Sequence, residues 1–193
     1  MKNALILHGA RNNSQGNWFP WLKNELEAIG YTVWAPDLPN SEKPIRKDWI
    51  NVIFSNPNWQ FNEKTVLVGH SAGAILILRI LEELPVGITI DKAVLVAGPI
   101  NLGTKPEFFQ YKEDLVKGSF NWEKIKKSAK HFYFFYSDND PYQCGSEHGI
   151  LLQQKLGGEL LIRSRQGHFN LEISPAYKQF PELLKLILLP NLA

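Results

Sequence analysis

Residues 65–83 read TVLVGHSAGAILILRILEE, and this stretch decides the fold. The run Thr65–Val68 has the β-branched and apolar composition of a buried strand, and an apolar segment with helical spacing follows within a few residues. A strand that leads directly into a helix is the repeating unit of a parallel α/β sheet. Gly69 and Gly73 flank Ser71 at the junction, so the sequence predicts a serine on a sharp turn between strand and helix.

Strand-like runs and longer segments with helical periodicity or turn residues alternate along the whole chain. The strands are expected at residues 4–8, 32–35, 65–68, 93–97, 132–136 and 159–162. The helices are expected at residues 18–29, 47–54, 72–84, 122–129, 147–156 and 176–188. Because most of the strands are apolar throughout, we expect both faces of the sheet to be covered. The predicted fold class is α/β, a three-layer α/β/α sandwich with a mainly parallel sheet of about six strands, in a single domain over residues 1–193.

The longest stretch without a regular pattern, 98–120, lies between the fourth expected strand and the next helix. It is rich in glycine, proline and aromatic residues, including Phe108, Phe109 and Tyr111. A segment of this length is too short to form an independent cap domain. We therefore expect a minimal fold without a large cap, and a relatively open site with a few aromatic side chains over it.

The composition excludes several classes of protein. The formal net charge is +2 and the basic residues are scattered among acidic ones, which argues against a nucleic-acid surface. The first apolar run, 4–7, is too short for a signal-sequence core, and no segment reaches the ~18 apolar residues of a membrane span. The single cysteine, Cys144, excludes an internal disulfide and a multi-cysteine metal cluster. We expect a cytoplasmic protein without metal or other cofactor that meets a small-molecule substrate, and no feature indicates a protein partner.

Two other uses of a parallel sheet do not match the sequence. The loop after the first expected strand reads HGARNNSQG and lacks the glycine pattern of a dinucleotide-binding turn. The glycine-rich pattern of a phosphate-binding loop, which ends in lysine and a serine or threonine, is also absent from the sequence. The serine turn therefore remains the one motif with a chemical interpretation.

Ser71 is the candidate nucleophile. A serine lifted above the sheet on a sharp turn has strained backbone angles, and neighbouring segments pass too close for side chains on either side of it, which explains the two glycines. The turn leaves the amide of Ala72 free at a helix N-terminus, where its partial positive charge can stabilise an oxyanion. The second oxyanion donor is expected in the loop after the first strand, where Ala10 is favoured and Arg11 is the alternative.

A serine hydroxyl attacks a carbonyl only with the help of a histidine base and of an acid that orients the histidine. Asp138 and Asp140 follow the fifth expected strand and His168 follows the sixth, in the chain order serine, acid, histidine that this architecture uses. Asp140 is favoured over Asp138 because it precedes Pro141, which holds the aspartate in an extended conformation. The predicted catalytic residues are Ser71, Asp140 and His168.

Arg11, Trp18 and His70 are the candidate substrate-binding residues. Arg11 lies in the expected oxyanion loop, Trp18 lies on the helix that follows this loop, and His70 directly precedes the nucleophile. For Trp18 and His70 the alternative is a packing role in the core. Cys144 is rejected as a nucleophile, because no strand-to-helix turn presents its thiol.

At these residues the chain resembles the α/β-hydrolase superfamily, and within it the small YdeN-like and retinoblastoma-binding-protein-9-like serine hydrolases. The likeness covers almost the whole chain and rests on GHSAG, HG after the first strand, NWFPWLKNEL, PDLPN with the DW that follows, GSFNWEKIKKSAK and GHF. It implies a compact sandwich without a large cap and a triad that maps onto Ser71, Asp140 and His168. The chain departs from the family at Gln143-Cys144, where valine and proline are usual.

These features predict a metal-free serine hydrolase, similar to a carboxylesterase, that cleaves a small ester or activated amide through an acyl-enzyme intermediate. The alternative is a protein-binding module on a hydrolase fold with little or no turnover, since a fold by itself does not decide function. A nucleophile, an acid and a base that follow in the correct order favour the enzyme.

Overall fold

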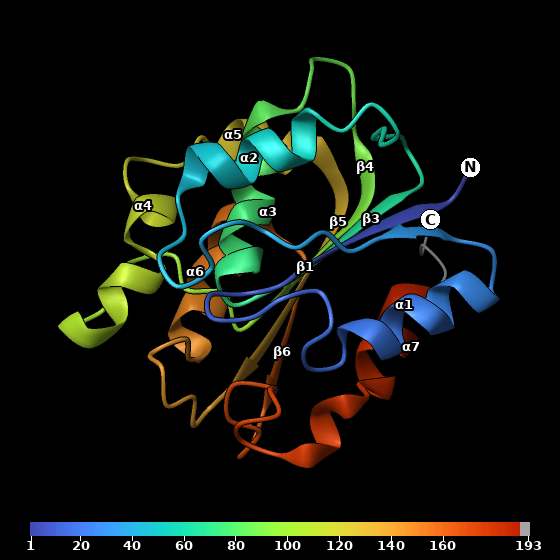
Figure 1. The fold of residues 1–193 in the computed structure, drawn as a ribbon. Helices are drawn as coiled ribbons and strands as arrows, with labels where there is room; N and C mark the ends of the chain where they lie inside the picture. The colour runs from blue at the N-terminus through green and yellow to red at the C-terminus, as the bar shows by residue number, and fades with distance from the viewer. Residues whose placement is uncertain (190–193) are drawn as a thin grey trace.

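The computed structural model describes residues 1–189, and its centre is a six-stranded sheet in the order β2-β1-β3-β4-β5-β6. Every pair of neighbouring strands runs parallel. Figure 1 shows the sheet passing through the middle of the molecule with helices on both sides. The strands are β1 (Asn3–Leu7), β2 (Thr32–Trp34), β3 (Thr65–His70), β4 (Ile90–Val96), β5 (Ala129–Ser137) and β6 (Glu159–Arg163).

Alternation of side chains along the strands divides the hydrophobic core into two layers. In β3, Leu67 faces one layer while Val66 and Val68 face the other. In β5, Phe134 faces the first of these layers and Phe135 faces the second. Successive side chains of a strand point to opposite faces, so a strand that is apolar at every position needs cover on both sides.

The helices supply that cover. One face carries α2 (Arg46–Phe54), α3 (Ala72–Glu83), α5 (Trp122–Ser128) and α6 (Ser146–Leu156), and the other carries α1 (Phe19–Ala28) and α7 (Pro181–Leu188), as Figure 1 shows. In α3 every residue except the last two is buried, which accounts for its continuous apolar sequence. The expected three-layer α/β/α sandwich around a parallel sheet is therefore confirmed. Within residues 1–189, no helix combines the length and the apolar character needed to cross a membrane.

The carboxyl-terminal helix is shorter than the sequence pattern suggested. The helix expected over 176–188 is interrupted, because a 3-10 turn, η2 (Pro175–Lys178), comes first and α7 begins only at Pro181. Proline has no amide hydrogen and its ring clashes with the preceding helical turn, so Pro181 occupies the first turn of a helix instead of its interior. A smaller difference is that Ala129, expected to end a helix, starts β5.

The segment 98–120, expected to be irregular, contains the 3-10 helix η1 (Pro106–Tyr111) and the short helix α4 (Glu113–Val116). Arg79, only 1% exposed, connects this segment to α3. Its Nε donates to the carbonyl oxygen of Leu115 (2.8 Å) and its Nη2 to that of Lys117 (2.9 Å). The guanidinium also lies 3.8 Å from the centre of the Phe120 ring. The segment is thereby held where it can form one wall of a cavity.

Candidate active site

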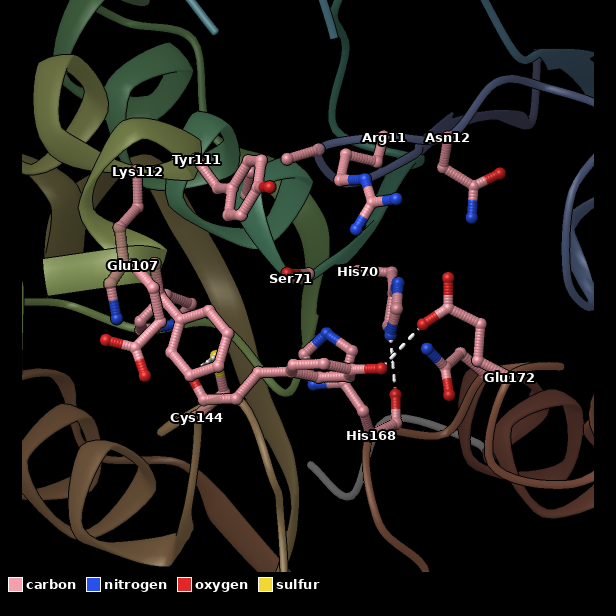
Figure 2. Close-up of a pocket in the computed structure, with 16 residues that line it drawn as sticks. Arg11, Asn12, His70, Ser71, Glu107, Tyr111, Lys112, Cys144, His168 and Glu172 are labelled. Carbon is pink, nitrogen blue, oxygen red and sulfur yellow. Dashed lines mark hydrogen bonds between the residues drawn. The ribbon is translucent and has the colours of Figure 1, made fainter. Parts of the chain in front are cut away.

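The carboxyl ends of β1, β3, β5 and β6 lie at one edge of the sheet, and the loops that follow them carry the candidate residues. A cavity of about 250 Å³ opens at this edge. Figure 2 shows Ser71 and His168 at the cavity, with Arg11 and Asn12 on one side and Lys112 on the other. The predicted site residues that line it are Ala10, Arg11, His70, Ser71, Ala72 and His168.

Ser71 sits on a strained turn, as the glycine pattern predicts. Its backbone angles are φ 54° and ψ −122°, in a region that side-chain-bearing residues rarely adopt. A Cβ on Gly69 would lie 2.5 Å from the carbonyl oxygen of Gly73, and a Cβ on Gly73 would lie 2.3 Å from that of Leu7. The Ser71 amide donates to the carbonyl oxygen of Val96 (2.8 Å), which ties the turn to the neighbouring strand. Close backbone contacts therefore require both glycines.

The loop after β1 distinguishes the two candidate oxyanion donors. The Arg11 amide donates to the carbonyl oxygen of Ser41 (2.9 Å), so it is already engaged. Ala10 lines the cavity directly beside it. On the other side, Ala72 is the first residue of α3, where a helix leaves its amides without acceptors of its own. Ala10 and Ala72 thus both line the cavity beside Ser71, whereas the amide of Arg11 is bonded elsewhere.

The structure brings Asp140, and not Asp138, to His168. Asp140 Oδ2 lies 2.6 Å from His168 Nδ1, and the two side chains are 0% and 6% exposed. Asp140 Oδ1 accepts a second hydrogen bond from the amide of Tyr142 (2.8 Å). Asp138 instead accepts from the amide of Arg165 (2.8 Å), and this hydrogen bond is the main reason why its pKa is lowered. The buried pair has the geometry that orients an imidazole with Nε2 directed away from the acid.

Three consecutive side chains, from the last residue of β5 onward, hold the loop that carries His168. Ser137 Oγ accepts from the amide of Gln166 (3.0 Å), and Asn139 Oδ1 accepts from the amide of Gly167 (2.8 Å) and from the Ser137 hydroxyl (2.8 Å). The Arg165 amide donates to Asp138, so the amides of three successive residues, 165–167, all donate to side chains of residues 137–139. The two loops form one unit that fixes the acid relative to the histidine.

The His70 ring is hydrogen-bonded to the backbone of His168. Its Nε2 donates to the carbonyl oxygen of His168 (2.7 Å), and the two rings lie 4.7 Å apart. Burial, and then the nearby charge of His168 when protonated, lower the pKa of His70 to about 3, so the ring is neutral at physiological pH. Its Nδ1 is buried and has no hydrogen-bond partner among residues 1–189. His70 therefore holds the backbone of the loop that carries His168 in place.

Trp18 does not line the cavity, which corrects the expectation from the sequence. The side chain is fully buried, and its Nε1 donates to the carbonyl oxygen of Phe169 (3.1 Å). The reason is that α1 packs against the sheet face shared with α7, so the apolar side chains at its start enter that core layer. Arg11, in contrast, stands at the rim, where its guanidinium lies 5.9 Å from the centre of the Tyr111 ring and 3.6 Å from Glu42.

Several cavity residues were not anticipated from the sequence. The clearest is Tyr142, whose ring lies 4.9 Å from that of His168 and whose hydroxyl donates to Glu172 (2.5 Å). Its position two residues after Asp140 was an available signal. Asn170 also lines the cavity and directly follows the motif that contains His168. Lys112 lines it too but comes from a segment without a recognisable motif, so its place follows only from the packing of distant segments.

Asp140, Cys144 and His168 place one ligand atom each within 4.8 Å of one another, so they merit testing as a metal centre. The His168 nitrogen and the Asp140 oxygen already share a hydrogen bond. Burial raises the pKa of the Cys144 thiol well above its usual value, whereas metal binding needs a thiolate. The chemistry of these donors fits a hydrogen-bonded acid and base better than a metal site, and the neutral thiol is also a poor nucleophile.

The fold and this site define the class of protein as an α/β-hydrolase. The chain belongs to the serine hydrolase family, whose model matches residues 4–188. It is 33% identical over 171 residues to YdeN of Bacillus subtilis (strain 168), covering 87% of this chain and 86% of YdeN. It is 26% identical over 181 residues to the serine hydrolase RBBP9 of Rattus norvegicus, covering 93% of this chain and 89% of RBBP9.

Solved structures agree with this assignment. The crystal structure of YdeN from B. subtilis superposes with a TM-score of 0.86 at 29% identity, over 97% of both chains. Est1E from Butyrivibrio proteoclasticus superposes with a TM-score of 0.67 at 13% identity, over 97% of this chain and 86% of Est1E. At such low identity, the second likeness shows the fold alone. The resemblance noted in the sequence is confirmed by the family match and by YdeN.

Proposed function

We propose that the protein hydrolyses a small ester or activated amide through a Ser71–His168–Asp140 triad and an acyl-enzyme intermediate. The observation that carries the proposal is the buried 2.6 Å contact between His168 Nδ1 and Asp140 Oδ2, next to a cavity that also exposes Ser71 on its strained turn. An acid on Nδ1 directs Nε2 toward the substrate side and stabilises the imidazolium that forms during the reaction.

The reaction begins when His168 Nε2 removes the proton from the Ser71 hydroxyl as the oxygen attacks the substrate carbonyl. The amides of Ala10 and Ala72 stabilise the negative oxygen of the tetrahedral intermediate. His168 then donates its proton to the leaving group, and the acyl group stays on Ser71. Water, deprotonated by His168, attacks the acyl-enzyme and releases the acid. All charge development occurs beside donors that are fixed before substrate binds.

Labelling with a fluorophosphonate probe tests the nucleophile directly, because such probes react with activated serines. We expect the wild type to be labelled, the Ser71→Ala variant to lose labelling, and the Ser55→Ala variant to keep it. Ser55 is a matched control, since it is exposed at the end of α2, away from the cavity. Hydrolysis of a series of 4-nitrophenyl esters would then show which acyl lengths the cavity accepts.

Two results would contradict the proposal. One is a folded wild-type protein that neither reacts with the probe nor hydrolyses any ester of the series. The other is labelling that persists unchanged in Ser71→Ala. The first result would favour the alternative of a binding module on a hydrolase fold, and the second would place the reactive group elsewhere.

A further inference from the structure

Within residues 1–189, Lys112 is a buried basic side chain whose amine has no hydrogen-bond partner. It lies between η1 and α4, its side chain is 3% exposed, and it lines the cavity together with Ser71 and His168. Figure 2 shows it on the side of the cavity opposite Arg11. Among residues 1–189, its Nζ has no hydrogen-bond partner and is shielded from solvent. This amine is therefore an unpartnered donor beside the cavity that the proposed reaction leaves unused.

The effect of burial on Lys112 exceeds the attraction of the acidic groups around it. Burial keeps the Cys144 thiol neutral by raising its pKa, and Asp140 is engaged by His168 and by the Tyr142 amide. Glu147, which also acts on Lys112 through space, has a side chain 68% exposed to solvent. No ion pair within the described part of the chain includes Lys112.

A buried ammonium group without hydrogen bonds is unfavourable, because it has lost its hydration without gaining acceptors. Consistent with this, burial lowers the pKa of the Lys112 amine below its usual value. An anionic ligand group would supply acceptors and a counter-charge at once, and charge-assisted bonds of this kind are stronger than neutral ones. The free protein thus holds a binding group whose natural complement is an anion that enters the cavity.

We propose that Lys112 binds a carboxylate on the substrate, so that the enzyme prefers monoesters of short dicarboxylic acids over uncharged esters of equal length. This inference rests on the proposed function and specifies its substrate class. We place the carboxylate in the acyl part, because the acyl group stays on Ser71 in the cavity while the leaving group must depart to solvent. A cavity of about 250 Å³ limits the acyl part to a short chain.

Glu107, five residues before this lysine, also lines the cavity. It is exposed, so water and salt screen its repulsion of an anion more strongly than they screen the attraction of the buried Lys112. We therefore expect Glu107→Gln to raise the preference for the charged ester modestly, in the opposite direction to the loss of Lys112.

The test compares 4-nitrophenyl monoesters of succinic, glutaric and adipic acids with uncharged 4-nitrophenyl esters of equal chain length. In the wild type we expect one of the charged esters to have the higher kcat/KM of its pair. Lys112→Met keeps the aliphatic stem and removes the charge, and should lower the charged-to-uncharged ratio of kcat/KM by about tenfold to a hundredfold. Lys117→Met, which removes an exposed lysine of the same segment, should keep the wild-type ratio.

Binding to the Ser71→Ala variant separates this inference from the proposed function. Calorimetry should show tighter binding of the charged ester than of its uncharged partner, and Lys112→Met in the same background should remove the difference. Active wild-type protein that prefers the uncharged ester at every length, or an unchanged ratio in Lys112→Met, would overturn the inference and leave the triad intact. If the wild type is inactive, the calorimetric comparison still decides the role of Lys112, and equal binding of both esters would refute it.

Discussion

At the scale of single residues, the site depends on which of two aspartates reaches His168. Asp138 and Asp140 are separated by one residue, yet one accepts a backbone amide at the surface while the other is buried against the imidazole. Residues 138 and 139 form a turn, so the alternation of a strand does not continue from Asp138 to Asp140, and Asn139 between them also bonds the histidine loop. The chemical difference between the two carboxylates comes from their partners.

The Asp140→Asn substitution should therefore abolish most turnover while the fold persists. An amide at this position no longer stabilises the imidazolium and favours the wrong tautomer, so we expect kcat to fall by about three orders of magnitude. Asp138→Asn is the matched control, because its amide oxygen can still accept from Arg165, and its kcat should stay near wild type. Steady-state kinetics with a 4-nitrophenyl ester measures both. A loss confined to Asp138→Asn would refute the assignment of the acid.

At the scale of elements, the loops after β5 and β6 act as one unit. Asn139 Oδ1 accepts one hydrogen bond from the Gly167 amide of the other loop and a second from the nearby Ser137 hydroxyl. The loops carry the acid and the base separately, so a shift of one loop against the other would separate Asp140 from His168. The hydrogen bonds between the two loops therefore fix the geometry of the proposed active site.

Asn139→Ala should lower kcat more than it changes KM, since it loosens the histidine loop without altering the cavity wall. Leaving the Gly167 amide without an acceptor should also reduce the free energy of unfolding by about 1–3 kcal/mol. Asn139→Asp keeps the accepting oxygen and should retain most of both properties. Kinetics together with urea unfolding of the two variants would check this, and an equal loss in both would show that the oxygen is not the relevant feature.

A second element-scale prediction concerns the cavity wall formed by η1 and α4. Arg79→Met removes the donors that hold the carbonyls of Leu115 and Lys117. We expect faster amide hydrogen exchange within 106–120 and little change within α3, because the substituted side chain still fills the core. Arg79→Lys should give an intermediate result, since one ammonium cannot reproduce the guanidinium geometry. Uniform protection in all three proteins would contradict the anchoring role.

At the scale of the whole molecule, buried histidines link folding to pH. Burial is the largest cause of the lowered pKa of His8, His70 and His148. In the unfolded chain these rings bind protons near pH 6.5, whereas in the folded chain they stay neutral to lower pH. The unfolded state thus binds more protons below this pH, so the stability is complete above about pH 6.5 and declines as the pH falls.

Urea unfolding between pH 7.5 and 5 should show this decline, with each such histidine contributing up to about 1.4 kcal/mol per pH unit. His70→Gln keeps a donor for the His168 carbonyl but removes one titrating ring, so its slope should be smaller by about one proton. The range stops above the pH where carboxylates protonate. An identical slope in His70→Gln and wild type would show that His70 is not neutral in the folded state.

Much of this protein was predictable from short stretches of sequence. The apolar strands, the Gly69-to-Gly73 turn and the order of Ser71, Asp140 and His168 are encoded locally, because strand periodicity and a strained turn depend on neighbouring residues. The break of the last helix at Pro181 was missed, although its signal was local, since the reason lies in proline itself.

Other features were decided only by the tertiary structure. Whether Trp18 faces the cavity depends on which side of the sheet α1 packs, and the hydrogen bond of Arg11 to Ser41 decides which amide stays free. The lack of a hydrogen-bond partner for the Lys112 amine within residues 1–189 depends on how the segment 98–120 packs at the site, where Arg79 holds it. Sequence determined the elements and the order of the chemical groups because those preferences are local. The partners of each buried polar group were left to the tertiary structure, because they come from segments far apart in the chain.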